Sequence, residues 1–242
     1  EEVSLRIPVF SKTELSLKKS SYRAVTGSRV SYQNNISTVE ALNSISLKIY
    51  RGEKIALIGH NGSGKSSFLR LISEIYYPTS GKIYKKVKPY PMLSPSFIVS
   101  EVLTGIDSAK AHYLFRYGNL KGFENYLNDI VEFSGLGDFI ALPIKTYSEG
   151  MKSRFIFSIL TFDKHEFLAL DEGIGTGDNS FYQKAEKRMR EFIANAGTLV
   201  FASHSPDLLK KFCSRGLVFS CGNVVYDGKL NDALNFYDKR NK

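Results

Sequence analysis

The chain has 242 residues, of which 43% are hydrophobic and 24% are charged, a composition typical of a globular protein. Two cysteines form no disulfide framework, no signal peptide opens the chain, and no apolar stretch approaches the roughly 18 residues that a membrane span requires. The net charge of +9 would suit nucleic acid, an anionic membrane surface or phosphate-bearing ligands, but the basic residues are scattered and match no nucleic-acid-binding motif. We therefore expect a cytoplasmic protein with no nucleic-acid partner.

Residues 1–30 are expected to form an N-terminal arm, which is either loosely packed or a docking element. Within it, residues 3–10 predict an extended segment and residues 13–25 predict a short basic helix. Residues 45–49 alternate between apolar and polar side chains, which predicts a half-exposed strand.

A glycine-rich pattern, G-x-x-x-x-G-K-[ST], lies between a predicted buried strand over residues 54–58 and a predicted helix over residues 66–75. Glycines let backbone N–H groups approach phosphate oxygens where a Cβ would obstruct them, and the helix N-terminus adds the positive end of its dipole. Lys65 is suited to reach the β- and γ-phosphates, and the Ser66 hydroxyl is suited to bind Mg²⁺. The predicted nucleotide-binding residues of this loop are Gly59, His60, Asn61, Gly62, Ser63, Gly64, Lys65, Ser66 and Ser67.

The middle of the chain is predicted to pass from strands to helices. After a turn, residues 82–84 predict a strand. Residues from about 100 to 145 favour helices and are expected to form a separate unit, in which an amphipathic helix begins at Phe123. Ser148 is a good N-cap residue for the helix that follows it.

Two further apolar runs, residues 167–170 and residues 198–202, predict buried parallel strands that end at one edge of a sheet. The first run ends in Asp171 and Glu172, and the second leads to His204. At such an edge Asp171 is suited to bind Mg²⁺, Glu172 to polarise a water that attacks the γ-phosphate, and His204 to hydrogen-bond that phosphate or water. Taken singly, these residues also suit an exposed acidic pair and a structural histidine. Together with the phosphate loop they indicate ATP hydrolysis.

The C-terminal third continues the alternation of helices and strands. It predicts a helix over residues 178–195, a hairpin over residues 217–226 and a last helix over residues 230–237. The sequence therefore predicts an α/β fold that binds a nucleotide at the ends of parallel strands.

At this point the sequence resembles the ATP-binding cassette (ABC) ATPases, from about residue 30 to residue 238. Residues 147–151 match the family signature, with Glu149 in place of a usual glycine, and Asp178 matches the acidic residue of the D-loop. The resemblance implies that the nucleotide is also contacted by Tyr32, Ser148, Glu149 and Gly150. For Tyr32, whose ring would stack on adenine, a surface tyrosine is the alternative.

The resemblance implies a single ABC ATPase domain over residues 1–242, with a mixed sheet, antiparallel N-terminal strands and a helical subdomain inserted over about residues 95–160. It implies a head-to-tail homodimer that holds ATP and Mg²⁺ between the phosphate loop of one copy and the signature of the other. It also implies a peripheral subunit on the cytoplasmic face of a bacterial inner membrane, beside a polytopic permease. We expect residues 89–123 to form the docking surface for that permease.

Within the family, the chain resembles the ATPase subunits of bacterial polysaccharide exporters of the O-antigen, capsule and teichoic-acid types, often called Wzt-type. This resemblance implies export of a lipid-linked polysaccharide. Some members of this branch carry a C-terminal carbohydrate-binding domain, but the sequence stops just after the cassette, so we expect no such domain here. Residues 92–102 lack the glutamine of the family's Q-loop, so Ser94, Ser96 or a backbone group is expected to take its role. The alternatives are a cassette for another substrate, a non-transport ABC ATPase, and a regulatory module without turnover.

Overall fold

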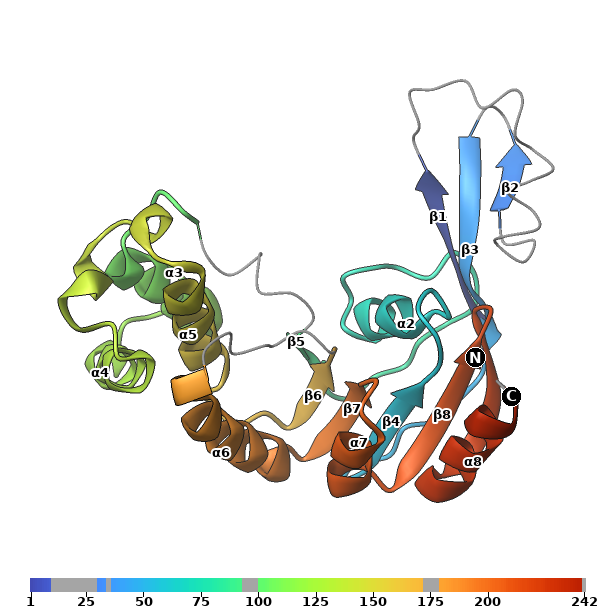
Figure 1. Ribbon diagram of the computed structural model, residues 1–242. Helices are drawn as coiled ribbons and strands as arrows, with labels where there is room; N and C mark the ends of the chain where they lie inside the picture. The colour runs from blue at the N-terminus through green and yellow to red at the C-terminus, as the bar shows by residue number, and fades with distance from the viewer. Residues whose placement is uncertain (10–29, 34–35, 93–99, 172–178, 241–242) are drawn as a thin grey trace. The chain divides into compact units, whose positions relative to one another are not determined.

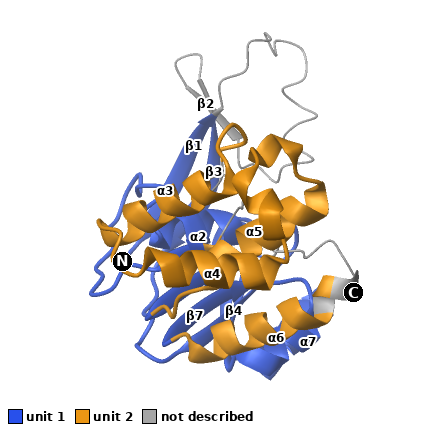
Figure 2. Ribbon diagram, turned by 90° about the vertical axis from the view of Figure 1, so that its left-hand side faces the viewer, with its two compact units in different colours: residues 1–91, 166–172, 197–242 blue, residues 92–165, 173–196 orange. Residues whose placement is uncertain are grey.

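The computed structural model describes residues 1–9, 30–33, 36–92, 100–171 and 179–240 (Figure 1). The chain divides into two compact units: residues 1–91, 166–172 and 197–242 form the first, and residues 92–165 and 173–196 form the second (Figure 2). The helical insertion expected over about residues 95–160 falls mostly within the range of the second unit. Its standing as a subdomain inserted into one cassette stays a prediction.

The first unit is built on a six-stranded mixed sheet, which confirms the predicted α/β class. Its central strands are apolar because both faces of a parallel sheet are covered. The last strand runs antiparallel to its neighbour and closes the predicted C-terminal hairpin. In spatial order the strands are β5 (Tyr90–Met92), β6 (Phe167–Leu170), β7 (Thr198–Ala202), β4 (Lys54–Ile58), β8 (Arg215–Ser220) and β9 (Asn223–Lys229).

A second, three-stranded antiparallel sheet is formed by β1 (Val3–Val9), β3 (Ile36–Ile45) and β2 (Val30–Gln33), in that order. It confirms the predicted antiparallel N-terminal strands and the extended segment near the start of the chain. The predicted helix over residues 13–25 lies outside the described residues.

Two predicted strands are wrong. Residues 46–49 carry no strand, because the Lys48 carbonyl accepts a hydrogen bond from the Arg215 guanidinium (2.9 Å) instead of joining a ladder. Residues 82–84 also carry none, and the Lys82 N–H donates to the Glu1 carbonyl at 3.2 Å. In both segments the alternation of apolar and polar residues is present, but no neighbouring strand among the described residues pairs with them.

Among the described residues of the first unit, three helices flank the sheets: α2 (Lys65–Ile72), α7 (Pro206–Phe212) and α8 (Leu230–Arg240). α2 contacts β3 and β7, whereas α8 packs on β8 and β9, and Figure 1 shows them on opposite sides of the six-stranded sheet. α2 ends earlier than predicted because Glu74 adopts a left-handed conformation (φ 61°). α7 was not predicted, although Ser205 caps it and Pro206 begins it, which are both start signals.

The second unit is helical. Its described α-helices are α3 (Gly105–Tyr117), α4 (Phe123–Ser134), α5 (Glu149–Leu160) and α6 (Asn179–Asn195), and two short 3-10 helices, η2 (Gly137–Ala141) and η3 (Ile144–Thr146), connect α4 to α5. The fully buried Tyr126, Ile130 and Phe155 lie in a core shared by α3, α4 and α5. In the described parts of the chain, every helix is too short or too polar to cross a bilayer.

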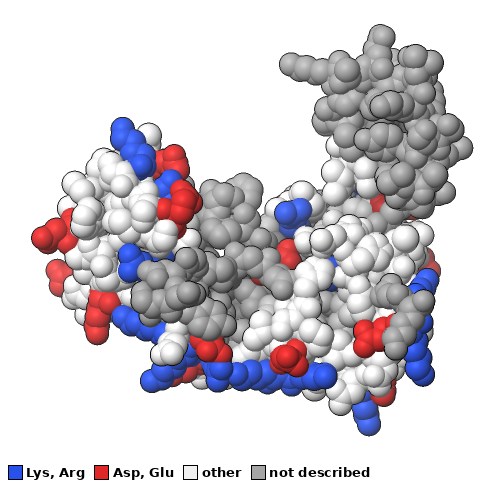
Figure 3. Space-filling view, viewed as in Figure 1, with Lys and Arg blue, Asp and Glu red and all other residues white. Residues whose placement is uncertain are grey.

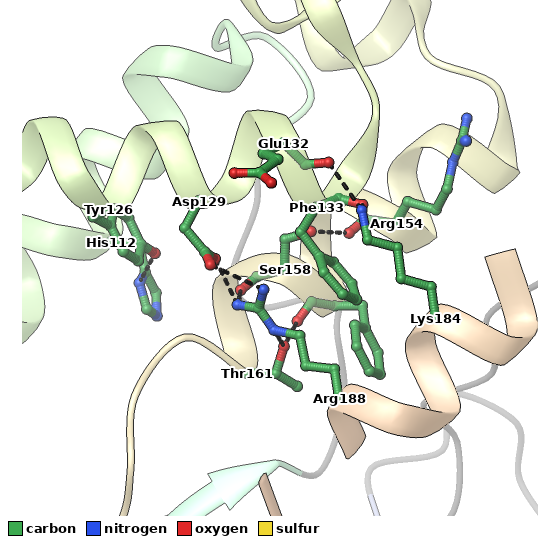
Figure 4. A network of polar contacts seen from close by, with 11 residues as sticks. His112, Tyr126, Asp129, Glu132, Phe133, Arg154, Ser158, Thr161, Lys184 and Arg188 are labelled. Atoms are coloured by element: carbon green, nitrogen blue, oxygen red, sulfur yellow. Dashed lines mark hydrogen bonds and ion pairs between the residues drawn. The ribbon is translucent and has the colours of Figure 1, made fainter. Parts of the chain in front are cut away.

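Side chains of α6 tie it to α4 and α5 (Figure 4). The Arg188 guanidinium donates to both carboxylate oxygens of Asp129, at 3.1 and 2.6 Å, and its Nε donates to the Thr161 hydroxyl at 2.8 Å. The guanidinium carbon also lies 4.2 Å from the centre of the Phe133 ring. A planar cation that satisfies a carboxylate in this bidentate way fixes both distance and orientation.

Candidate functional site

Parallel strand pairing brings the candidate residues to one edge of the six-stranded sheet. β7 lies between β6 and β4, and Leu170 at the end of β6 is in register with Phe201 near the end of β7. All three strands run in the same direction. The residues that follow them, Asp171, Gly59 and His204, therefore leave the sheet at its carboxyl edge, where open α/β sheets bind ligands.

The phosphate loop, residues 59–66, turns directly from β4 into α2. Gly64 is the N-cap of α2 and has a left-handed conformation with φ 117°. A Cβ at this position would lie 3.0 Å from the Ala41 carbonyl oxygen and 3.1 Å from a Leu42 methyl carbon. The loop therefore packs closely against β3 and leads into the N-terminus of α2, where a helix offers backbone N–H groups to an anion.

The Lys65 ammonium is held inside this loop. Only 8% of the residue is exposed, and its Nζ donates to the carbonyl oxygens of Gly59 at 2.5 Å and His60 at 3.1 Å. These two backbone carbonyls therefore hold the positive charge in the cradle, where it is available to an anionic ligand rather than to bulk solvent.

A cavity of about 600 Å³ opens beside the loop, within the range of small-molecule sites. It is lined by Ile7, Val39, Ala41, Asn61, Gly62, Ser63, Gly64, Lys65, Ser66, Ser67, Asp171, Ala202 and His204. The structure thus brings together most of the predicted phosphate-loop residues with the acidic residue and the histidine from the two neighbouring strands. Of the loop, Gly59 and His60 do not line this cavity.

The donor set of this cavity fits a magnesium ion. Ser66 and Asp171 both line it and offer a hydroxyl and a carboxylate, the hard oxygen ligands that Mg²⁺ prefers. In the described ranges no three residues among His, Cys, Asp and Glu gather as a metal cluster. An ion held by one or two protein oxygens together with substrate phosphates is the usual arrangement for Mg²⁺.

His204 borders a second cavity of about 360 Å³ on its other side. This second cavity is lined from α7 by Leu209 and Lys210 and from α8 by Asn231 and Asn235, and Gly59 lies at its boundary with the loop. His204 is exposed and therefore stands at the junction of the two cavities.

Several predicted residues are not part of this description. Glu172, Asp178, Ser94 and Ser96 lie outside the described residues. The backbone of Tyr32 is described in β2, in register with Ser37, but its side chain is not. The contact of Tyr32 with adenine stays a prediction.

The signature residues begin α5 in the second unit. Ser148 is its N-cap, and its hydroxyl accepts a hydrogen bond from the Met151 N–H at 3.2 Å, as predicted from its position. Glu149 and Gly150 form the first turn, and Glu149 pairs with Lys152 at 3.3 Å. This turn presents backbone N–H groups in the same way as the start of α2.

Sequence reasoning missed the apolar wall of the larger cavity, which consists of Ile7, Val39, Ala41 and Ala202. Val39 and Ala41 are two positions apart on β3 and therefore share one face of the strand. The spacing of Val39 and Ala41 could have indicated a shared apolar face of β3. That face could be assigned to the cavity only once the pairing of β3 with β1 was known.

Comparison with known proteins places the chain in a family. The model of the family described as ABC transporter matches residues 42–175, which include the phosphate loop and Asp171. The chain is 37% identical over 232 residues to the O-antigen export system ATP-binding protein RfbE of Yersinia enterocolitica, covering 96% of this chain and 97% of that protein. It is 35% identical over 206 residues to the teichoic acids export ATP-binding protein TagH of Enterococcus faecalis, covering 85% of this chain but only 46% of that protein.

Solved structures share the fold. A dimeric, post-hydrolysis structure of the ATP-binding cassette MJ0796 with ADP and Pi superimposes with a TM-score of 0.63 at 19% identity, covering 84% of this chain and 95% of that one. The ATP-binding subunit of another ABC transporter gives a TM-score of 0.63 at 20% identity, covering 88% of this chain and 92% of that one. These likenesses establish the fold of the cassette.

Proposed function

The chain belongs to the ABC transporter family, and from this premise we propose that it is the ATP-hydrolysing subunit of an exporter of lipid-linked polysaccharide. The observation that carries the proposal is the similarity to RfbE, which extends over 96% of this chain and 97% of that protein. The similarity to TagH supports the same class, because that protein is named as an ATP-binding protein for the export of teichoic acids. The transported polymer is therefore proposed to be a glycan of the O-antigen type.

We propose that ATP binds in the larger cavity with its phosphates in the loop. The N–H groups at the start of α2 and the Lys65 ammonium would neutralise the β- and γ-phosphates, and the apolar wall beside Val39 would adjoin the base with Tyr32. Ser66 and Asp171 would hold Mg²⁺, which supplies charge neutralisation to the phosphate oxygens when bound.

For hydrolysis we assign Glu172 as the residue that accepts a proton from the attacking water. The water oxygen bonds to the γ-phosphorus as the bond from that phosphorus to the β–γ bridging oxygen breaks, so the products are ADP and inorganic phosphate. His204, at the end of β7, would donate a hydrogen bond to the γ-phosphate and orient it against the water.

We propose that two copies associate head to tail around ATP. Ser148, Glu149 and Gly150 of one copy would present the N-terminus of α5 to the γ-phosphate held by the other copy, so the nucleotide is neutralised from both sides. Asp178 would lie at the same dimer contact. Hydrolysis and phosphate release would remove the shared anion and let the copies separate.

The partner would be a polytopic permease in a bacterial inner membrane, with this subunit at the cytoplasmic face. Residues 89–123 are the proposed docking region. In the second unit, Val102 and Leu103 precede α3 and are 75% and 37% exposed. Exposed apolar side chains of this kind suit a protein contact.

Purification from native membranes tests the proposal. The tagged chain is extracted in detergent, with Lys65→Ala as a matched variant that is expected to lose ATP affinity but keep its fold. Recovery of a polytopic membrane protein in about equal amount, together with ATPase activity that the variant lacks, is the expected result. An active ATPase recovered without a membrane protein would move the non-transport alternative to first place, and an inactive chain in both forms would favour the regulatory module.

A further inference from the structure

The segment of residues 70–88, which we call the lysine–tyrosine segment, is rich in cations and aromatic side chains. It contains one acidic residue, and the rest of its charge is positive. Apart from the end of α2 it has no regular secondary structure, so its side chains are not committed to a helix or sheet core. Its cations are Arg70, Lys82, Lys85, Lys86 and Lys88, and its tyrosines are Tyr76, Tyr77 and Tyr84.

Glu74 folds the segment back onto the end of α2. Its carboxylate accepts from Lys85 at 3.1 Å and from Lys88 at 3.0 Å, and Lys85 also donates to the Ile72 carbonyl at 2.7 Å. Hydrogen bonds from Lys88 and Lys85 hold the pKa of Glu74 below its usual value, so the carboxylate stays charged. The one acid is thus engaged by two lysines, and the Arg70 guanidinium carbon lies 5.8 Å from the centre of the Tyr76 ring, which leaves Lys82 and Lys86 as the remaining cations of the segment.

Two tyrosines and two lysines of the segment are exposed and lie outside this ion-pair cluster. Tyr77 is 80% exposed and Tyr84 is 72% exposed, which is unusual for large aromatic side chains. Lys82 and Lys86 are exposed and form no ion pair with the described residues. The Lys82 backbone is anchored by hydrogen bonds with Glu1, which fixes the middle of the segment.

We propose that the lysine–tyrosine segment binds the anionic lipid surface of a membrane. Lysine ammonium groups are attracted to anionic headgroups, and tyrosine places an apolar ring and a polar hydroxyl at the level where headgroups meet acyl chains. This inference rests on the proposed function, because a subunit that works beside a permease meets the lipid around it. Figure 3 shows Lys and Arg in several separate groups on the face in view, so net charge alone does not select a surface. The combination of cations with exposed tyrosines distinguishes the lysine–tyrosine segment from these other groups.

Flotation of the purified full-length chain with lipid vesicles tests this proposal without the permease. We expect binding to vesicles of phosphatidylethanolamine and phosphatidylglycerol, and much weaker binding to vesicles of phosphatidylcholine. The double variant Lys82→Gln/Lys86→Gln should lower the partition coefficient by about 25-fold, since each lysine near an anionic surface contributes about fivefold. Raising the salt concentration should weaken the binding of the unmodified chain.

Lys229→Gln/Lys239→Gln is the matched control, because it removes two exposed lysines from the same unit at the ends of β9 and α8. Equal loss in both double variants, or no binding to phosphatidylglycerol, would overturn the proposal. Tyr77→Ser/Tyr84→Ser should reduce binding that remains at high salt, and no effect would remove the tyrosines from the surface. A fluorescent oligonucleotide that binds more tightly than vesicles and depends on the same lysines would reassign the segment to nucleic acid. ATP hydrolysis, measured in parallel, reports separately on the proposed function.

Discussion

The Gly222 N–H donates a hydrogen bond to the Ser63 carbonyl oxygen at 2.8 Å, so the turn of the β8–β9 hairpin supports the phosphate loop. The Gly222 carbonyl in turn accepts from the Asn43 N–H at 2.9 Å, which connects the turn to β3. The loop is therefore braced by two elements that lie far from it in the sequence. Its shape depends on tertiary contacts as well as on its own glycines.

Gly59→Ala is expected to weaken ATP binding by more than about tenfold, because the loop would have to move away from its brace. A Cβ at Gly59 would lie 2.5 Å from the Phe219 carbonyl oxygen and 2.6 Å from the Ser63 hydroxyl oxygen. Titration with a fluorescent ATP analogue measures the change.

Gly52→Ala is the control for this prediction. Gly52 also has a positive φ, of 88°, but a Cβ there would meet nothing within 4 Å. The control should cost about 1 kcal/mol of stability through backbone strain and leave nucleotide affinity unchanged. Equal affinity of both variants would argue against the brace.

Glu172→Gln is expected to lower ATP turnover by roughly 10²–10⁴-fold and to leave ATP affinity nearly unchanged. Glutamine keeps the size of the side chain but cannot accept the proton of the attacking water. Steady-state phosphate release and nucleotide titration separate the two effects. Turnover at the original rate would remove Glu172 from the role of base.

Arg188→Ala is expected to lower the free energy of unfolding by about 2 kcal/mol, because it removes a bidentate pair that joins α6 to α4. The Arg188 side chain is only 15% exposed in this pair. Arg188→Lys should restore only part of the loss, because an ammonium cannot bind both oxygens of Asp129 in one plane. Urea unfolding followed by circular dichroism measures each variant.

Arg190→Ala serves as the comparison. Arg190 pairs with Glu186 on the surface of the same helix, and its side chain is 48% exposed. Its loss should change stability by less than about 0.5 kcal/mol. If Arg188→Ala and Arg190→Ala lowered the free energy of unfolding by similar amounts, the buried bidentate geometry of the Arg188 pair would add no stability beyond that of a surface pair.

The second unit is expected to lose stability as the pH falls from about 6.5 toward about 4. Burial and the Arg116 charge lower the pKa of His112 and of His165 to about 4, while the Asp163 carboxylate acts weakly in the opposite direction. Arg116 donates to His165 Nδ1 at 3.1 Å, and arginine has no acceptor, so that nitrogen must be unprotonated.

The lowered pKa values of the two histidines set the direction in which stability changes with pH. The unfolded chain takes up protons near the ordinary histidine pKa of 6.5, whereas the folded unit resists them until about pH 4, so stability is complete above 6.5 and is lost below it. Between pH 7 and pH 5 we expect each histidine to lower the free energy of unfolding by about 1–2 kcal/mol. His112→Gln should reduce this pH dependence in urea unfolding, and an unchanged dependence would contradict the assignment.

Local chemistry determined much of the candidate site. The strand, glycine turn and helix around Lys65 follow from backbone propensities that act within a few residues, and the apolar runs before Asp171 and His204 mark buried parallel strands. The cap formed by Ser148 is equally local. These features could be predicted because the residue types that produce them lie within a few positions of one another, although the exact shape of the phosphate loop also depends on tertiary contacts.

Structural features that depend on a partner far away in the chain could not be predicted from the sequence. Residues 46–49 have the alternation of a strand, but the Lys48 carbonyl accepts a hydrogen bond from the Arg215 guanidinium, and the Lys82 backbone is hydrogen-bonded to Glu1. Periodicity reports which side chains are apolar, but a ladder exists only where another strand supplies the missing hydrogen bonds.

The sequence by itself determined the phosphate loop with its flanking strand and helix, and the residue types at the ends of the apolar strands. Only the tertiary structure decided that Asp171, His204 and the loop line one cavity, that Ile7 and Val39 form its apolar wall, and that Gly222 supports it from a hairpin about 160 residues later. The physical reason is that sequence patterns encode local backbone preference and burial. Strand pairing and the packing of distant elements depend on which surfaces meet when the whole chain folds.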